Sequence, residues 1–81
     1  MLSSTEARQY NLALDQSLSR TQDNLSLLAN RHLTADQQSS VREIEELLRQ
    51  ANATRKVDLT SARALADKAQ VLARDLVRNV K

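Results

Sequence analysis

The side chains that could carry acid–base or metal chemistry are few and poorly placed for it. Three glutamates cluster at Glu43, Glu45 and Glu46, and grouped carboxylates can bind hard metal ions or transfer protons. In a helix, however, residues one or two apart point to different faces. The Glu-x-x-His motif of di-metal bundles is also missing. We therefore expect these glutamates to lie on a solvated helix face, with no metal or other cofactor.

The single histidine, His32, and the absence of cysteine and glycine restrict catalysis further. Without cysteine there is no thiolate nucleophile, disulfide or sulfur-ligated metal site. Without glycine there is no nucleophile elbow and no phosphate-binding loop. We expect His32 to lie at a helix end, where a cation suits the helix dipole. The chain is predicted to be no enzyme, with no catalytic residue and no small-molecule substrate.

A basic face is predicted near the end of the chain. Arg74, Arg78 and Lys81 follow one another at spacings of four and three, which places them on one face of a helix. Cations stabilise a helix C-terminus by themselves, and the same face also suits an acidic partner or lipid headgroups. The net charge of +2 arises within residues 58–81, and charges of both signs are interspersed elsewhere. Nucleic-acid binders usually concentrate basic residues and stacking aromatics, so this pattern argues against nucleic acid.

Three large side chains are candidates for a protein interface. Tyr10, Leu12 and Leu27 lie off the main apolar stripe of their segment, which predicts partial exposure. Exposed apolar side chains that gather together mark an interface, whereas single ones are ordinary. Both interpretations stay open at this point. A protein partner or self-association is the expected kind of interaction.

The elements that position these residues are predicted to be helices. Apolar residues recur at spacings of three, four and seven, as in helices that bury one face. No glycine or proline is available for the turns of an all-β fold. Helix starts are indicated by capping boxes at Ser3 and Thr34 and by an N-cap at Asp58. Asn30 is expected to end the first helix in a left-handed conformation.

These signals predict an all-α, antiparallel three-helix bundle with long helices and short loops. The helices are expected at about residues 4–30, 35–56 and 59–80 of one domain that spans 1–81. The third has the broadest apolar face and should contact both others, with Leu48 and Leu72 in the core. The apolar runs are too short for a membrane span.

The first helix carries two polar residues, Asn11 and Thr21, within its apolar stripe. Buried polar groups cost free energy unless they find partners. Either these side chains form hydrogen bonds across the bundle and fix its register, or the helix is held loosely and can exchange for another. We favour the second alternative.

The segment from Asp58 to Leu76, with the run DLTSARALADKA, resembles a helical motif of bacterial envelope proteins. It is similar to the C-terminal domain of lipoproteins of unknown function, where a helix with the pattern L-T-x-x-Q-x-x-x-V-x-x-I precedes one with G-D-L-x-x-A. Leu33, Thr34, Gln37 or Gln38, Val41 and Ile44 match the first pattern. The second matches from Asp58, with Val57 in place of the glycine. The likeness covers about residues 24–78.

This resemblance implies an accessory domain that faces the periplasm and has no known catalytic residue. Because no signal peptide or lipobox cysteine is present, the sequence would then be one domain of a longer protein. We therefore expect a structural or protein-interaction module of the cell envelope. A cytoplasmic adaptor or regulatory bundle is the alternative, followed by a binder of anionic surfaces or nucleic acid.

Overall fold

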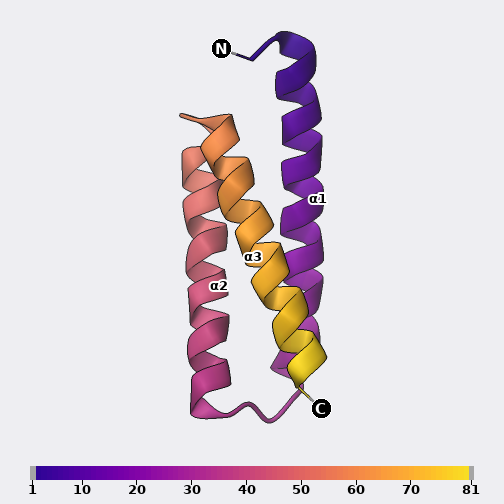
Figure 1. Cartoon of the computed structure of the whole chain (residues 1–81), viewed down its shortest axis with the longest axis vertical. Helices are drawn as coiled ribbons and strands as arrows, with labels where there is room; N and C mark the ends of the chain where they lie inside the picture. The colour runs from indigo at the N-terminus through magenta and orange to yellow at the C-terminus, as the bar shows by residue number, and fades with distance from the viewer. Residues whose placement is uncertain (1, 81) are drawn as a thin grey trace.

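Three helices make up the fold in a computed structural model that describes residues 2–80. Helix α1 spans Ser4–Ala29, α2 spans Ala35–Thr54 and α3 spans Leu59–Asn79. Helices α1 and α3 run in the same direction, and α2 runs antiparallel to both (Figure 1). The predicted all-α three-helix bundle is confirmed.

The first two helices begin with the capping boxes that the sequence predicts. The Ser3 hydroxyl accepts a hydrogen bond from the Glu6 amide at 3.1 Å, and the Glu6 carboxylate accepts one from the Ser3 amide at 3.4 Å. Thr34 and Gln37 form the same reciprocal pair at 3.1 and 2.8 Å. Each box satisfies two backbone donors that the first turn leaves free.

Helix α3 begins at the predicted N-cap, Asp58. One carboxylate oxygen accepts from the Ser61 amide at 3.2 Å, and the other accepts from the Ser61 hydroxyl at 2.7 Å. The hydrogen bond from the Ser61 hydroxyl has the larger effect and the bond from the Ser61 amide the next largest. Together they hold the pKa of Asp58 below its ordinary value of 3.8. These bonds favour the ionised form, so the cap depends on the charge.

The cap at Asp58 predicts a specific sensitivity to acid. Because the pKa is lower in the folded state, the stabilisation is fully present above pH 3.8 and is lost as the pH falls through the folded value. Asp58→Asn keeps a capping oxygen and cannot titrate. Thermal melts from pH 7 down to pH 2 should therefore show a smaller fall in Tm for the variant than for the wild type. Parallel curves would contradict this role of the Asp58 charge.

The end of α1 differs from the sequence prediction. Asn30 has φ −95° and ψ 9°, so the expected left-handed conformation is wrong. The chain instead leaves the helix through a turn in which the Arg31 amide donates to the Leu28 carbonyl at 3.0 Å. His32 was expected at the helix end, but it lies beyond the C-cap and is exposed in the joint that follows.

Helix α2 also ends earlier than expected, at Thr54. The amides of Val57 and Asp58 donate to the Thr54 carbonyl at 2.9 and 2.7 Å. These bonds close a tight turn that leads directly into α3, and no residue in it needs positive φ.

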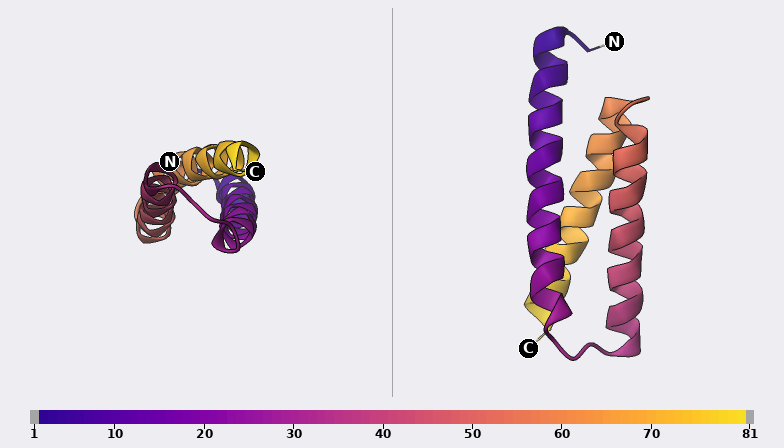
Figure 2. Two further views of the ribbon diagram at one scale, coloured as in Figure 1. Left: turned by 90° about the horizontal axis from the view of Figure 1, so that it is seen from below. Right: turned by 180° about the vertical axis from the view of Figure 1, so that it is seen from behind.

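Helix α3 is the central element. Both α1 and α2 pack along it, whereas α1 and α2 approach each other only marginally. Viewed along the bundle, α1 and α2 stand apart on the same side of α3 (Figure 2). The prediction that the third helix contacts both others is confirmed.

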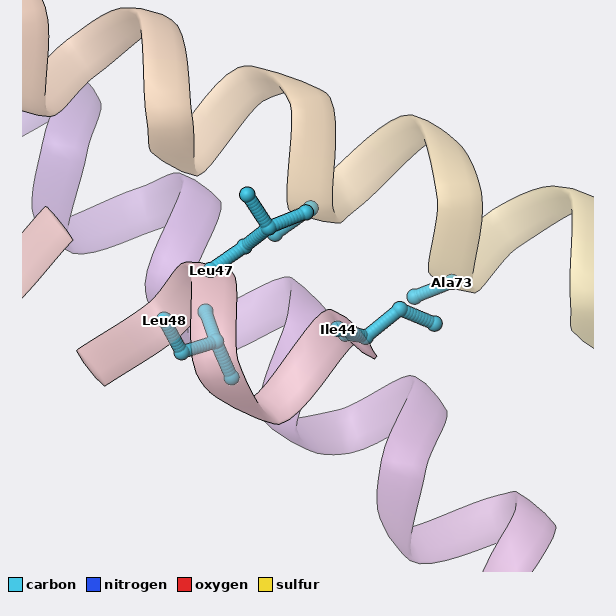
Figure 3. Packing of buried hydrophobic residues seen from close by; sticks show 5 residues of the cluster. Ile44, Leu47, Leu48 and Ala73 are labelled. Carbon is cyan, nitrogen blue, oxygen red and sulfur yellow. The ribbon is translucent and has the colours of Figure 1, made fainter. Parts of the chain in front are cut away.

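A seam of alanines brings α3 close to its neighbours. Ala62, Ala66, Ala69 and Ala73 are each 0% exposed, and alanine permits close approach of two helix backbones. Ile44, Leu47 and Leu48 of α2 pack against the second half of this seam (Figure 3). Leu14 of α1 packs against the first half, together with Ala51 of α2.

The two predicted core leucines differ in burial. Leu48 is buried at 5% exposure, as expected. Leu72 is only half-buried and packs on the margin of the core. The alanine seam occupies the centre of the α3 face, so the leucines of that helix flank it.

The polar residues in the α1 stripe have hydrogen-bond partners. Thr21 is 0% exposed, and its hydroxyl donates to the Ser17 carbonyl of the same helix at 2.7 Å. The Ser17 hydroxyl donates to the Asp67 carboxylate of α3 at 3.2 Å. Asn11 accepts a hydrogen bond from Arg55, the C-cap of α2, at 3.0 Å, so this side chain does bond across the bundle. Thr21 bonds within its own helix. Loose attachment of α1 stays a prediction.

Candidate interaction surfaces

A groove lies between α1 and α2, on the side away from α3. Its volume is 350 Å³, and the residues that line it are Gln22, Leu25, Glu45, Leu48, Arg49 and Asn52. All of them belong to α1 or α2. The half-buried Leu25 and the buried Leu48 form the floor. The other four side chains are exposed and form the rim.

The rim is polar and carries both charge signs. It presents the amides of Gln22 and Asn52, the carboxylate of Glu45 and the guanidinium of Arg49. Arg49 forms an ion pair with Glu46 of the same helix. The accessible surface of the groove is therefore mainly polar, as the outer part of a protein interface is.

A polar bridge from Arg55 also links α1 and α2. This residue is the C-cap of α2, and its guanidinium reaches across to α1. The Nη2 atom donates to Asn11 Oδ1 at 3.0 Å and to Asp15 Oδ1 at 2.9 Å. The Arg55 side chain is 25% exposed, so the bridge is partly shielded from water. It is a polar link between the two helices that otherwise stand apart.

Removal of the Arg55 bridge should cost measurable stability. We expect Arg55→Ala to lower the free energy of unfolding by about 1 kcal/mol, because a charge-assisted pair of hydrogen bonds is lost. Arg49→Ala is the matched control, since the Arg49 side chain is 75% exposed. That control should change stability by no more than about 0.5 kcal/mol. Urea denaturation measures both changes in the free energy of unfolding. If Arg55→Ala lowered it no more than Arg49→Ala does, the bridge would contribute nothing to stability.

The predicted interface residue Tyr10 lies on the edge of α1 that faces α3. Its ring is half-buried, and the Arg63 guanidinium carbon lies 4.7 Å from the ring centroid. Arg63 Nε is in turn 4.0 Å from an Asp67 carboxylate oxygen. The aromatic face of Tyr10 therefore makes a cation–π contact within the chain. A role for Tyr10 in binding a partner stays a prediction.

Leu12 and Leu27 are exposed on the outward side of α1, at 59% and 56%. Fifteen helical residues separate them, which corresponds to about 22 Å. They do not form one patch. Leu27 instead borders a small notch of 50 Å³ with Leu28, Arg31, Val77 and Val80.

The predicted basic residues Arg74 and Arg78 are exposed in the last turns of α3. Arg74 lines a shallow cleft of 320 Å³ between α1 and α3, together with Arg20, Asp23, Asn24 and Gln70. This surface mixes acidic and basic groups. Lys81 lies outside the described residues.

No constellation for metal chemistry is found within residues 2–80: no group of three or more histidine, aspartate or glutamate side chains could hold an ion. The three clustered glutamates lie on α2, where Glu43 and Glu45 are exposed and Glu46 is half-buried. Over the same range, no helix has the length and apolar character to cross a membrane.

Comparison with known proteins gives no match to a protein-family model, a curated protein or a solved structure. The resemblance to envelope lipoproteins stays a prediction.

Proposed function

We propose that the chain is a non-catalytic helical module that binds another protein. The observation that carries this proposal is the open side of the bundle. Helices α1 and α2 both pack on α3 and leave between them a groove lined mainly by polar side chains around the half-buried Leu25. In a closed three-helix bundle, α1 and α2 would also pack against each other and cover this groove.

The bundle exposes more surface than a compact protein of its mass. The accessible surface is 5674 Å², whereas a compact monomer of 9.1 kDa exposes about 4,900 Å². The radius of gyration is 13.6 Å, against about 11.7 Å for a compact domain of this length. The surplus of roughly 800 Å² accompanies an elongated shape with extents of 44 × 16 × 15 Å, which leaves long helix surfaces open to contact.

The cellular compartment that we propose rests only on the resemblance to envelope lipoproteins. We propose the cell envelope, with a cytoplasmic adaptor as the alternative. Fractionation of cells that carry the natural gene with an epitope tag separates the two. Recovery from the periplasm or an envelope membrane supports the first, and recovery from the cytosol supports the second.

Site-specific photo-crosslinking in those cells tests the protein-binding function. A photoreactive amino acid is placed in turn at Gln22, Asn52, Leu12, Val71 and Arg74, which are all exposed. We expect a discrete protein adduct from positions that share one face and none from the opposite face. Absence of any protein adduct, or adducts with nucleic acid only, would overturn the proposed function.

A further inference from the structure

We propose that α1 is an exchangeable helix, which swings out about the joint at residues 30–34 and packs on α3 of a second copy of the chain. The second copy returns its own α1 in the same way, so the product is a reciprocally swapped dimer. Every contact between α1 and α3 is then made between chains instead of within one. Exchange of α1 between copies is independent of the binding of another protein proposed above.

Helix α1 packs against one neighbour only. It lies along α3 and hardly contacts α2, and the two helices stand apart when the bundle is viewed along its length (Figure 2). The Arg55 bridge to Asn11 at 3.0 Å and to Asp15 at 2.9 Å is the polar link between them. Helices α2 and α3 therefore keep their own interface when α1 leaves.

The buried face of α1 is less apolar than that of α2. The buried residues of α1 are Leu14, Ser17, Thr21 and Leu28. Those of α2 are Ile44, Leu47, Leu48 and Ala51. Two of the four in α1 are hydroxyl residues, and a buried hydrogen-bonded hydroxyl adds less net stability than a buried leucine or isoleucine. We therefore expect α1 to open at a lower free energy than the α2–α3 pair.

The polar contacts of α1 specify what replaces it. The Ser17 hydroxyl donates to the Asp67 carboxylate of α3 at 3.2 Å, and the Arg63 guanidinium of α3 lies 4.7 Å from the centroid of the Tyr10 ring. An incoming helix must satisfy Asp67 and Arg63 at this spacing while it fills the space of Leu14. The α1 helix of a second copy carries these groups in the required register.

The joint between α1 and α2 has the properties of a hinge. Residues 30–32 and 34 are exposed, and the turn is closed by the bond from the Arg31 amide to the Leu28 carbonyl at 3.0 Å. The joint between α2 and α3 is tighter, because the amides of Val57 and Asp58 both donate to the Thr54 carbonyl and Asp58 at once caps α3. Opening is therefore expected at the first joint and not at the second.

Single cysteines test the exchange, because the full chain contains none of its own. Asn24 of α1 and Gln70 of α3 line one cleft between these helices. One copy carries Asn24→Cys, and a second copy with a mass tag carries Gln70→Cys. The two are mixed at about 1 mM, since a helix tethered by a short linker competes at a millimolar effective concentration. A short bismaleimide then joins thiols that lie close together.

The matched control replaces the first copy with Ser26→Cys. Ser26 is exposed on α1 and does not line the cleft. A second control carries Asn24→Cys and Gln70→Cys in one chain and is crosslinked as a dilute monomer, which fastens α1 to its own α3. Unchanged circular dichroism and Tm before crosslinking establish that each variant folds.

We expect the Asn24→Cys and Gln70→Cys copies to give at least about tenfold more interchain adduct than the Ser26→Cys control, because the swap raises the effective concentration of the two thiols. The fastened chain should stay monomeric at the same concentration. The proposal is overturned if no interchain adduct forms, if the Ser26→Cys control reacts equally, or if the fastened chain dimerises as the unfastened chain does. Binding of another protein is read separately by photo-crosslinking in cells and stands or fails without the swap.

Discussion

Replacing Leu14 with alanine should leave a large part of the protein unfolded at room temperature. Leu14 is 0% exposed and packs in a cluster with Ala51, Ala62 and Ala66. Alanines have no side-chain freedom with which to fill the cavity, so the cost should lie near the upper end of the usual range, about 3–5 kcal/mol. The core of a domain of this size supplies only about 3–5 kcal/mol in total.

Leu12→Ala is the control for this experiment. The same atoms are removed from the same helix, but Leu12 is 59% exposed, and its loss should change stability by no more than about 0.5 kcal/mol. Urea denaturation followed by circular dichroism gives both values. Similar midpoints for Leu14→Ala and the wild type would show that α1 does not pack on α3 through this residue.

Enlarging Ala66 to leucine should also destabilise the protein, for the opposite reason. Ala66 is 0% exposed in the seam of α3, in the same cluster as Leu14 of α1 and Ala51 of α2. The added atoms must push at least one neighbouring helix away from α3. Overpacking of this kind costs about 1–3 kcal/mol, and the fall in Tm measures it.

Ala64→Leu separates this steric effect from helix propensity. Ala64 lies on α3 but is exposed, and leucine is nearly as good a helix former as alanine. The Tm of this variant should stay close to that of the wild type. If Ala66→Leu were equally harmless, α3 would not be held against its neighbours by close backbone approach.

Features that depend on neighbours in sequence were predictable. The capping boxes at Ser3 and Thr34 and the cap at Asp58 join residues three apart, and the structure has all of them. Burial of Leu48 followed from its central place in an apolar stripe. The expected left-handed Asn30 failed because the turn after α1 closes through the Arg31 amide without positive φ.

The groove could not be predicted, because apolar spacing identifies the buried face of a helix but not the helix that covers it. Leu48 was assigned to the core, and the rim residues are ordinary polar side chains. The Arg55 side chain donates a hydrogen bond to Asn11, which lies 44 residues away in the sequence. No local sequence pattern predicts such a contact. Conversely, Leu12 and Leu27 were recognised as exposed, but their separation along α1 became clear only in three dimensions.

The most direct measurement of the proposed protein-binding function is site-specific photo-crosslinking of the full chain in cells. Gln22 and Asn52 border the groove between α1 and α2, whereas Leu12 and Val71 are exposed outside it. We expect a discrete protein adduct from the positions that share one face and none from the opposite face. Absence of a protein adduct from every position, or adducts with nucleic acid only, would contradict the proposed binding function.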